Sequence, residues 1–351
     1  MSDADKKKRW KLILNIVTVV ALLALGYAIR HQILDTIDNL GKVNAWALLL
    51  MLPIELWNYD AYSRMYRYLF ARLGDKVSYK DMFKVSLELT LVNHVFPSGG
   101  VSGFSYFSLR MKKLDVSPGK STLVQTIKLV MLFVSFEALL LIGLLFLVLG
   151  GHVSNLTILV ASSVATLLLV GTAGAAFLIG SETRINSFFT YATRAINRLI
   201  KIVRPKHPET INIAKTQQTF KELHQNYLLI KKDYKQLLPP LMFGFFANLT
   251  EVLAIYVVYI AFGHWVNPGA VILAYAVANF AGLISVLPGG VGVYEALMTA
   301  VLATAGVSPA ISLPVTVMYR VVNMTIQIIP GYYFYHKSLH DSPTSISPAE
   351  G

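Results

Sequence analysis

The residues that could do chemistry in this chain are ionisable side chains that lie in or beside long apolar blocks. An ionisable group surrounded by hydrocarbon is costly, and it normally faces a partner, a water-filled cavity or a ligand. Taken singly, each one fits a structural ion pair as well as a ligand contact. The set is Glu55, Asp60, Glu88, His94, Lys128, Glu137, Glu251, Glu295 and Arg320, accompanied by the amides Asn58, Asn93, Gln125, Asn248, Asn279, Asn323 and Gln327.

Two glycine-rich turns interrupt apolar stretches of the chain. The first is Pro97-Ser98-Gly99-Gly100, and the second is Pro288-Gly289-Gly290-Val291-Gly292. Irregular backbone survives at membrane depth only where protein or water satisfies it, so we expect both turns to line a polar cavity. A helix that begins after such a turn presents free amides, which favour an anion such as a lipid phosphate. Close helix packing is the alternative use of these small residues.

The best candidate pair among the ionisable residues is Glu295 with Arg320, because Glu295 opens the helix after the second turn. Arg320 and Lys128 are the two basic residues deep in apolar blocks. Arginine binds phosphate through a bidentate fork and lysine binds it as a point charge. We therefore expect a substrate site formed by the turns with these three side chains, and a surrounding polar cavity. The substrate-binding residues are predicted to be Pro97, Gly99, Gly100, Lys128, Pro288, Gly289, Gly290, Gly292, Glu295 and Arg320, and the supporting residues Asp60, Glu88, Asn93, Glu137, Glu251, Asn279 and Asn323.

The composition indicates which elements must position these residues. Of the 351 residues, 55% are hydrophobic and only 14% are charged, whereas a soluble domain carries about 25% charge. About 20 apolar helical residues cross a bilayer, and blocks of this length recur along the chain. We predict an all-α polytopic membrane protein with about six full spans, near residues 12–29, 44–63, 121–150, 153–180, 237–262 and 309–335.

The basic residues predict the orientation of these spans. Of the 31 lysines and arginines, 26 lie in the segments 1–11, 64–84, 110–120 and 181–236. Basic loops stay in the cytoplasm, so both termini are expected there. Residues 85–109 then have to enter and return on one side, which predicts a re-entrant hairpin that turns at Pro97; a kinked full span is the alternative.

The two halves of the chain align when one is shifted by 191 residues. Pro97 then falls on Pro288, Gly99 on Gly290, and Asp60 on Glu251. The predicted units are residues 44–150 and 235–337, each a span, a broken hairpin and a span, inserted in opposite directions. Inverted repeats with discontinuous helices are typical of transporters. We expect a single domain over residues 1–337 and a disordered tail over residues 338–351.

The runs around the two turns resemble the signatures of a known family. Residues 93–101 with Ser117-Pro118 resemble the first signature, and residues 287–295 with Tyr319-Arg320 resemble the second. The family is the lysylphosphatidylglycerol synthase transmembrane region, or flippase-like domain, and the resemblance covers roughly residues 10–337. It implies a bacterial or archaeal cytoplasmic-membrane protein, and in bifunctional members this region moves aminoacylated phosphatidylglycerol between leaflets. The chain ends without the synthetase domain of those members, and Phe104-Ser105-Tyr106 stand where many relatives carry a charge.

The segment 181–236 is expected to be a basic amphipathic helix on anionic lipid headgroups, followed by a second helix that returns to the membrane. A docking surface for a partner enzyme is the alternative, and no folded basic domain points to nucleic acid.

The chain has no cysteine, which excludes disulfides, thiolate metal sites and cysteine nucleophiles. The histidines are not spaced as metal ligands, and we expect neither metal nor cofactor.

These patterns favour a lipid translocase that moves an anionic or aminoacylated phospholipid, or another polar lipid, between leaflets. The main alternative is a non-catalytic membrane partner that presents lipid to a separate glycosyl- or aminoacyl-transferase. An ion-coupled transporter of a soluble solute comes third. A membrane-embedded enzyme comes last, because no nucleophile or metal set is recognisable.

Overall fold

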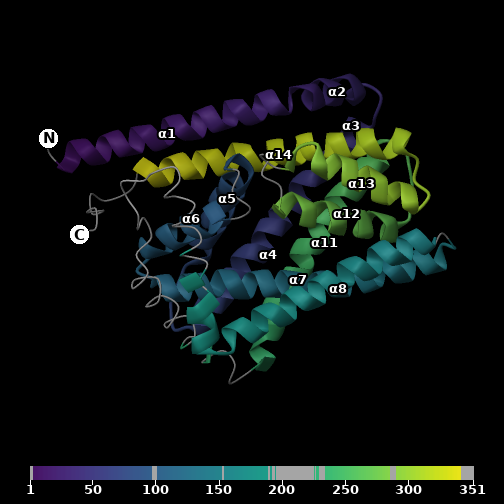
Figure 1. Cartoon of the computed structure of the whole chain (residues 1–351). Helices are drawn as coiled ribbons and strands as arrows, with labels where there is room; N and C mark the ends of the chain where they lie inside the picture. Colours follow the sequence, from purple (N-terminus) through teal and green to yellow (C-terminus); the bar gives the residue numbers. More distant parts are fainter. Residues whose placement is uncertain are drawn as a thin grey trace.

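The computed structural model describes residues 3–96, 101–151, 154–188, 190, 191, 194, 225, 227, 228, 234–284 and 290–340. The described chain is all helical, as predicted (Figure 1). Its elements are α1 (Asp3–Ala28), α2 (Arg30–Leu40), α3 (Ala45–Leu48), α4 (Met51–Arg72), α5 (Tyr79–Val95), α6 (Val101–Lys112), α7 (Pro118–Leu149), α8 (Asn155–Ile179), the 3-10 turn η1 (Tyr234–Leu237), α11 (Leu238–Ala261), α12 (Pro268–Ile284), α13 (Val293–Thr304) and α14 (Pro309–His340).

Serine side chains begin the two longest apolar helices. The hydroxyl of Ser117 accepts a hydrogen bond from the backbone N–H of Lys120 at 3.3 Å, and Pro118 occupies the first turn of α7. Ser154 accepts one from the N–H of Thr157 at 3.1 Å at the start of α8. Such caps satisfy backbone donors that have no partner inside the helix. The Ser-Pro-Gly-Lys run therefore functions as a helix start.

The structure confirms a polytopic helical membrane protein. Three of the described helices are long and apolar enough to span a membrane. These are α7, α8 and η1 with α11, and a fourth span arises if α1 and α2, which meet at a bend of 59°, cross the membrane together. The predicted spans at 44–63 and 309–335 correspond to α4 and α14. Both helices, with 22 and 32 residues, are long enough to cross, but they carry the polar side chains described below.

Helix lengths repeat between the two halves of the chain. The pairs α5 and α12, α6 and α13, and α7 and α14 have 17, 12 and 32 residues respectively. The bounds of α7, shifted by 191, coincide with those of α14 at both ends. Contacts repeat as well, since α5 packs on α14, α12 packs on α7, and α4 packs along α11.

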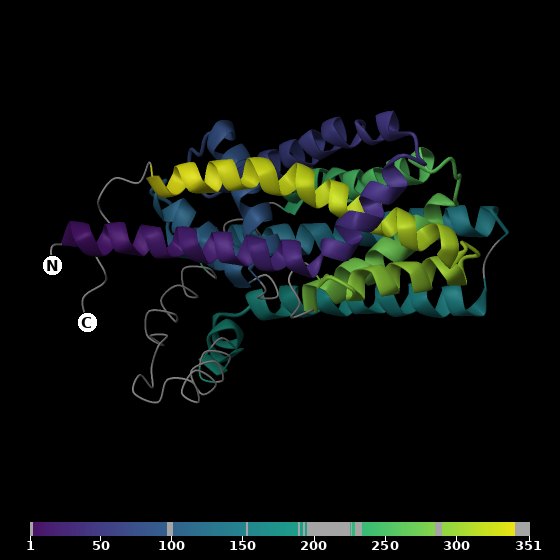
Figure 2. The same ribbon diagram turned by 90° about the horizontal axis from the view of Figure 1, so that it is seen from above.

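The ends of the described chain lie together at one end of the molecule (Figures 1 and 2). The start of α1, the end of α14 and the turn between α6 and α7 gather there. The turns from α7 to α8 and from α13 to α14 lie at the opposite end. α7 and α14 therefore run in opposite directions.

Two predicted boundaries change. Residues 30–43, expected to be a connection, contain α2, because polar and apolar residues alternate there with a helical period. Residues 338–340, expected to belong to the tail, instead end α14, and the hydroxyl of Ser338 donates to the carbonyl of Tyr335 at 2.9 Å. Residues 341–351, and most of the basic segment 181–236, lie outside the described residues.

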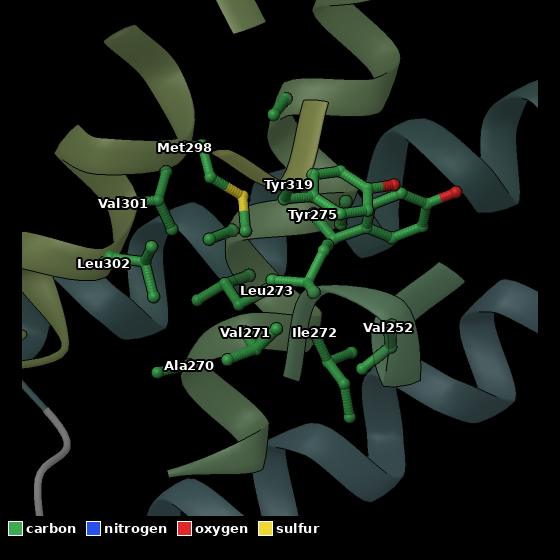
Figure 3. Close-up of a cluster of buried hydrophobic side chains, with 14 of the residues drawn as sticks. Val252, Ala270, Val271, Ile272, Leu273, Tyr275, Met298, Val301, Leu302 and Tyr319 are labelled. Atoms are coloured by element: carbon green, nitrogen blue, oxygen red, sulfur yellow. The ribbon is translucent and has the colours of Figure 1, made fainter. Parts of the chain in front are cut away.

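The largest apolar core lies around α12 (Figure 3). Side chains of α12 such as Ile272 and Leu273 pack between Val252 of α11 and Met298 and Leu302 of α13. This core holds α13, and the turn before it, in a fixed position relative to α14.

Glycines allow close contact in two equivalent helix pairs, α5 with α14 and α12 with α7. A Cβ atom on Gly331 of α14 would lie 2.8 Å from the carbonyl oxygen of Leu87 in α5, and one on Gly269 at the start of α12 would overlap the backbone of Gly143 in α7. Both pairings between the two units therefore require a residue without a side chain.

We predict that Gly331→Ala and Gly269→Ala each lower the thermal unfolding midpoint of the detergent-solubilised protein. Overpacking of this kind costs about 1–3 kcal/mol. Intrinsic tryptophan fluorescence during heating measures the midpoint. Gly174→Ala is the matched control, because a Cβ atom at Gly174 has open space around it. Equal midpoints for all three variants would contradict the proposed close packing.

Candidate functional site

The second glycine turn leads directly into α13. Gly290 and Gly292 have φ angles of 65° and 85°, a left-handed conformation that glycine adopts without strain. Gly292 is the N-cap residue of α13, and its backbone N–H donates to Oε2 of Glu295 at 2.7 Å. The turn thus fixes the first turn of α13 and the carboxylate of Glu295 together.

The predicted pair of Glu295 and Arg320 forms an ion pair. Nη1 of Arg320 lies 2.9 Å from Oε1 of Glu295, and the two side chains are only 6% and 5% exposed. The same nitrogen lies 3.4 Å from the carbonyl oxygen of Gly290, and the guanidinium stacks 4.8 Å from the ring centre of Tyr294. Arg320 therefore ties α14 to the glycine turn.

Helix α2 supplies a third contact to this carboxylate. Nε2 of Gln32 donates to Oε1 of Glu295 at 3.0 Å. Gln32, Asp35, Thr36 and Asn39 recur at the spacing of one helical face, and together they line a cavity. The helical spacing of these polar residues is visible in the sequence, but polar residues after a span also suit a connection, so the sequence analysis does not predict α2.

The cavity lies between α2, α13 and α14 and has a volume of about 660 Å³. Its remaining wall consists of Gly292, Glu295 and small or apolar residues of α13 and α14. The opposite face of α2 exposes Leu34, Ile37 and Leu40. A helix that turns apolar residues outward and polar residues toward a cavity is the reverse of a soluble surface helix and fits a lipid-facing position.

The ionisable side chains that line the cavity are acidic. Asp35 is exposed to it, and Glu295 closes it at the ion pair. The guanidinium of Arg320 lies directly behind Glu295. The cavity therefore offers hydrogen-bonding groups and carboxylates to a ligand, and Arg320 is joined to it through the ion pair with Glu295.

Glu251 and Asn323, both predicted to support the site, join a second polar cluster. The hydroxyl of Tyr319 donates to Oε2 of Glu251 at 2.9 Å, and Nδ2 of Asn323 lies 3.4 Å from the Tyr319 hydroxyl. Because Tyr319 and Arg320 are neighbours in α14, this cluster lies beside the ion pair with Glu295.

Lys128 has different surroundings from Arg320. Its ammonium group lies 5.4 Å and 5.6 Å from the ring centres of Tyr62 and Tyr66. No acidic side chain of the described ranges lies within 4.0 Å of it. Lys128 is not among the residues that line the cavity with Glu295. Its ammonium group instead lies over the rings of Tyr62 and Tyr66.

Two predicted acids pair with basic residues elsewhere. Asp60 bonds Arg64 at 2.7 Å, one helical turn away. Glu88 bonds Nε of Arg110 at 2.8 Å, which joins α5 to α6. Neither residue lines the cavity.

The other predicted residues are distributed as follows. Asn93 and Asn279 are exposed, and Oε1 of Glu137 in α7 is buried with no hydrogen-bond partner among the residues that the structure describes. Pro97, Gly99, Gly100, Pro288 and Gly289 lie outside the described residues. Within the described ranges, no cluster of three or more histidines and acids could hold a metal ion.

Comparison with known proteins gives a consistent result. Residues 12–331 match the family described as "Lysylphosphatidylglycerol synthase TM region". The chain is similar to a UPF0104 membrane protein of Methanocaldococcus jannaschii, with 20% identity over 92% of both chains. It is also similar to UPF0104 membrane proteins of Pyrococcus horikoshii (24% identity over 40% of this chain) and Methanothermobacter thermautotrophicus (26% over 29%). In these two cases the match spans only 44% and 30% of the relative's length.

We predict that Arg320→Ala strongly destabilises the protein. Removal of one partner leaves Glu295 as a buried, uncompensated charge, which costs about 3–5 kcal/mol. The thermal unfolding midpoint in detergent measures the loss, and the double variant Arg320→Ala/Glu295→Gln should recover part of it. The control is Arg64→Ala, whose exposed pair with Asp60 contributes little. A midpoint for Arg320→Ala equal to that of the control would show that the pair contributes nothing.

Proposed function

Because the chain belongs to the lysylphosphatidylglycerol synthase TM region family, we propose that it is a lipid translocase. Its substrate is an anionic or aminoacylated phospholipid, or another polar lipid. The observation that carries the proposal is the cavity of about 660 Å³ that α2 lines with a polar face and that ends on the Glu295–Arg320 pair. A polar headgroup crosses hydrocarbon only where protein groups replace its water.

The chemistry of the cavity matches a phospholipid headgroup. Arg320 is held by Glu295, and a phosphate oxygen can take the place of that carboxylate in a bidentate contact. The released Glu295 and the exposed Asp35 then accept hydrogen bonds from an amine or hydroxyl of the headgroup. The apolar face of α2, with Leu34 and Ile37, leaves the acyl chains in contact with lipid.

We also propose that the two units form an inverted repeat. The matched helix lengths, the opposite directions of α7 and α14, and the reciprocal packing of α5 on α14 and α12 on α7 support this. In this interpretation α1, α4, α7, α8, α11 and α14 are the full spans, and α5–α6 and α12–α13 are re-entrant hairpins. Rocking of one unit against the other would open the site to each side in turn.

The orientation follows from the basic residues. The end of the molecule that holds both described chain ends faces the cytoplasm, because the predicted basic segments 1–11, 64–84 and 110–120 lie toward it. The cavity of α2, α13 and α14 includes Ala303 and Pro309 near the opposite end. It is therefore open toward the outer half of the membrane. The basic segment 181–236 would bind anionic headgroups at the cytoplasmic surface.

We predict that Asp35→Asn and Asn39→Leu slow the movement of a fluorescent phospholipid between leaflets of reconstituted vesicles. Asp35→Asn removes a negative charge of the cavity wall and Asn39→Leu removes an amide; loss of a hydrogen bond to a charged group costs about 1.5–3 kcal/mol, or roughly a tenfold or larger loss of rate. Vesicles with an aminoacylated and an anionic probe, assayed separately, identify the headgroup class.

The matched control is Asp38→Asn, which changes an exposed carboxylate of the same helix that does not line the cavity. All variants should retain the unfolding midpoint of the unmodified protein. Unchanged flipping by both cavity variants would overturn the proposed site. No flipping by the unmodified chain, together with copurification of a lipid-modifying transferase, would favour a protein that presents lipid to that enzyme.

A further inference from the structure

The second polar cluster joins two acids that the lipid site does not use. Glu55 of α4 is only 2% exposed, and Glu251 lies on α11, the helix that packs along α4. Asn58, which contacts Glu251, lies one helical turn after Glu55, so the two carboxyl groups are neighbours where α4 packs on α11. Nε2 of Gln327 donates to Oε2 of Glu55 at 3.0 Å, and Nδ2 of Asn58 approaches Oε1 of Glu251 at 3.4 Å.

Neither acid has a basic partner in the described part of the chain. No lysine, arginine or histidine nitrogen of these residues lies within 4.0 Å of Glu55 or Glu251. Arg320, the nearest cation along α14, is bound to Glu295. The ionisable groups around the two carboxyls, by helix, are Tyr59 and Tyr62 on α4, Tyr275 on α12, Tyr294 on α13 and Tyr319 on α14, with His94 of α5 and Lys128 of α7 beyond them.

Two amide oxygens of the cluster lack a hydrogen-bond donor among the described residues. Oε1 of Gln327 and Oδ1 of Asn323 are buried and have no hydrogen-bond partner within the described ranges, and these side chains are only 4% and 6% exposed. The amide nitrogen of Gln327 already donates to Glu55, and that of Asn323 to Tyr319. Buried acceptors without donors are costly. An added proton or metal cation would give these oxygen atoms a partner.

We propose that Glu55 and Glu251 form a binding site for one monovalent cation. The cation is either a proton shared by the two carboxyl groups or a sodium ion held by their oxygens with the amide oxygens of Gln327 and Asn323. One added positive charge removes the repulsion between the acids and gives the orphan acceptors a partner. Two carboxylates in hydrocarbon without any cation would be far more costly.

Helix α14 connects this cation site to the lipid site. Tyr319 bonds Glu251, while the next residue, Arg320, bonds Glu295. Asn323 and Gln327 follow Tyr319 at intervals of one turn and face the same cluster. The ring of Tyr319 is anchored in the apolar core beside Tyr275 (Figure 3), so a shift of α14 changes both sites together. Cation binding would therefore bias the lipid site, an inference that rests on the proposed function.

The cation site is tested without lipid transport. Infrared difference spectra of the purified full-length chain, recorded across acidic to alkaline buffers with and without sodium, report protonated carboxyl groups and their displacement. We expect a protonated-carboxyl band at neutral pH that is lost at higher pH, or, for a sodium site, a sodium-dependent change in the carboxylate bands. Glu55→Gln and Glu251→Gln should abolish the response or shift its midpoint by at least about tenfold in cation concentration.

Asp38→Asn, an exposed acid on α2, is the control and should leave the response unchanged. Because glutamine is neutral and of similar size, both test variants should fold, which the unfolding midpoint checks. A spectrum without any response to pH or sodium, or the full response in both glutamine variants, would overturn the cation site. A persistent cation response with no lipid flipping would leave this site in place and remove the proposed function instead.

Discussion

The constraint on which this structure depends is that hydrocarbon offers no partner to a charge or to a free backbone amide. Every polar group therefore has to find its partner inside the protein. Arg320 and Glu295 satisfy each other, the amide of Gly292 is satisfied by the same carboxylate, and the carbonyl of Gly290 contacts the same arginine. The irregular turn before α13 can exist at this depth because one ion pair serves both its backbone and its side chains.

The same constraint explains why two helices that should cross the membrane are not uniformly apolar. In α14, Tyr319, Arg320, Asn323 and Gln327 all lie on the side that meets other helices. In α4, Asn58 bonds Thr250 of α11 and Glu55 bonds Gln327 of α14. Apolar content is then concentrated on the lipid-facing side, so mean hydropathy underestimates such helices. α7 and α8 are long and apolar enough to qualify as spans, although α7 also buries Ser121, Gln125 and Ser135.

Much of the fold could be predicted from the sequence because hydropathy and basic loops constrain helices directly. The Glu295–Arg320 pair was predictable for a similar reason, since a deep arginine needs an acid and Glu295 follows the glycine turn. The role of α2 was missed, although Gln32, Asp35 and Thr36 share a helical face, because polar residues after a span also suit a loop. Only the structure could distinguish a cavity-lining helix from a connection.

The contacts between helices that are distant in the sequence could not be predicted from the sequence. The shift by 191 residues relates Asp60 to Glu251 as equivalent positions, yet in space Glu251 contacts Asn58 and Tyr319 while Asp60 bonds Arg64. Equivalence within a repeat and contact between repeats are different relations. A repeat shows which positions correspond, while the crossing of α4 over α11 decides which of them meet. The ion pair between Glu88 and Arg110 depends in the same way on how α5 folds back onto α6.

Helix α14 contacts both polar clusters, since its side chains bond Glu295 in one and Glu251 and Glu55 in the other. It contains prolines at positions 314 and 330, and a proline inside a helix removes a backbone hydrogen bond and permits bending. Pro330 stands next to Gly331, where α14 touches the backbone of α5. Between the two prolines lie the residues that contact Glu251, Glu295 and Glu55. Bending at both ends of its polar segment would move that segment as a unit, and this is the route by which the proposed cation site would act on the lipid site.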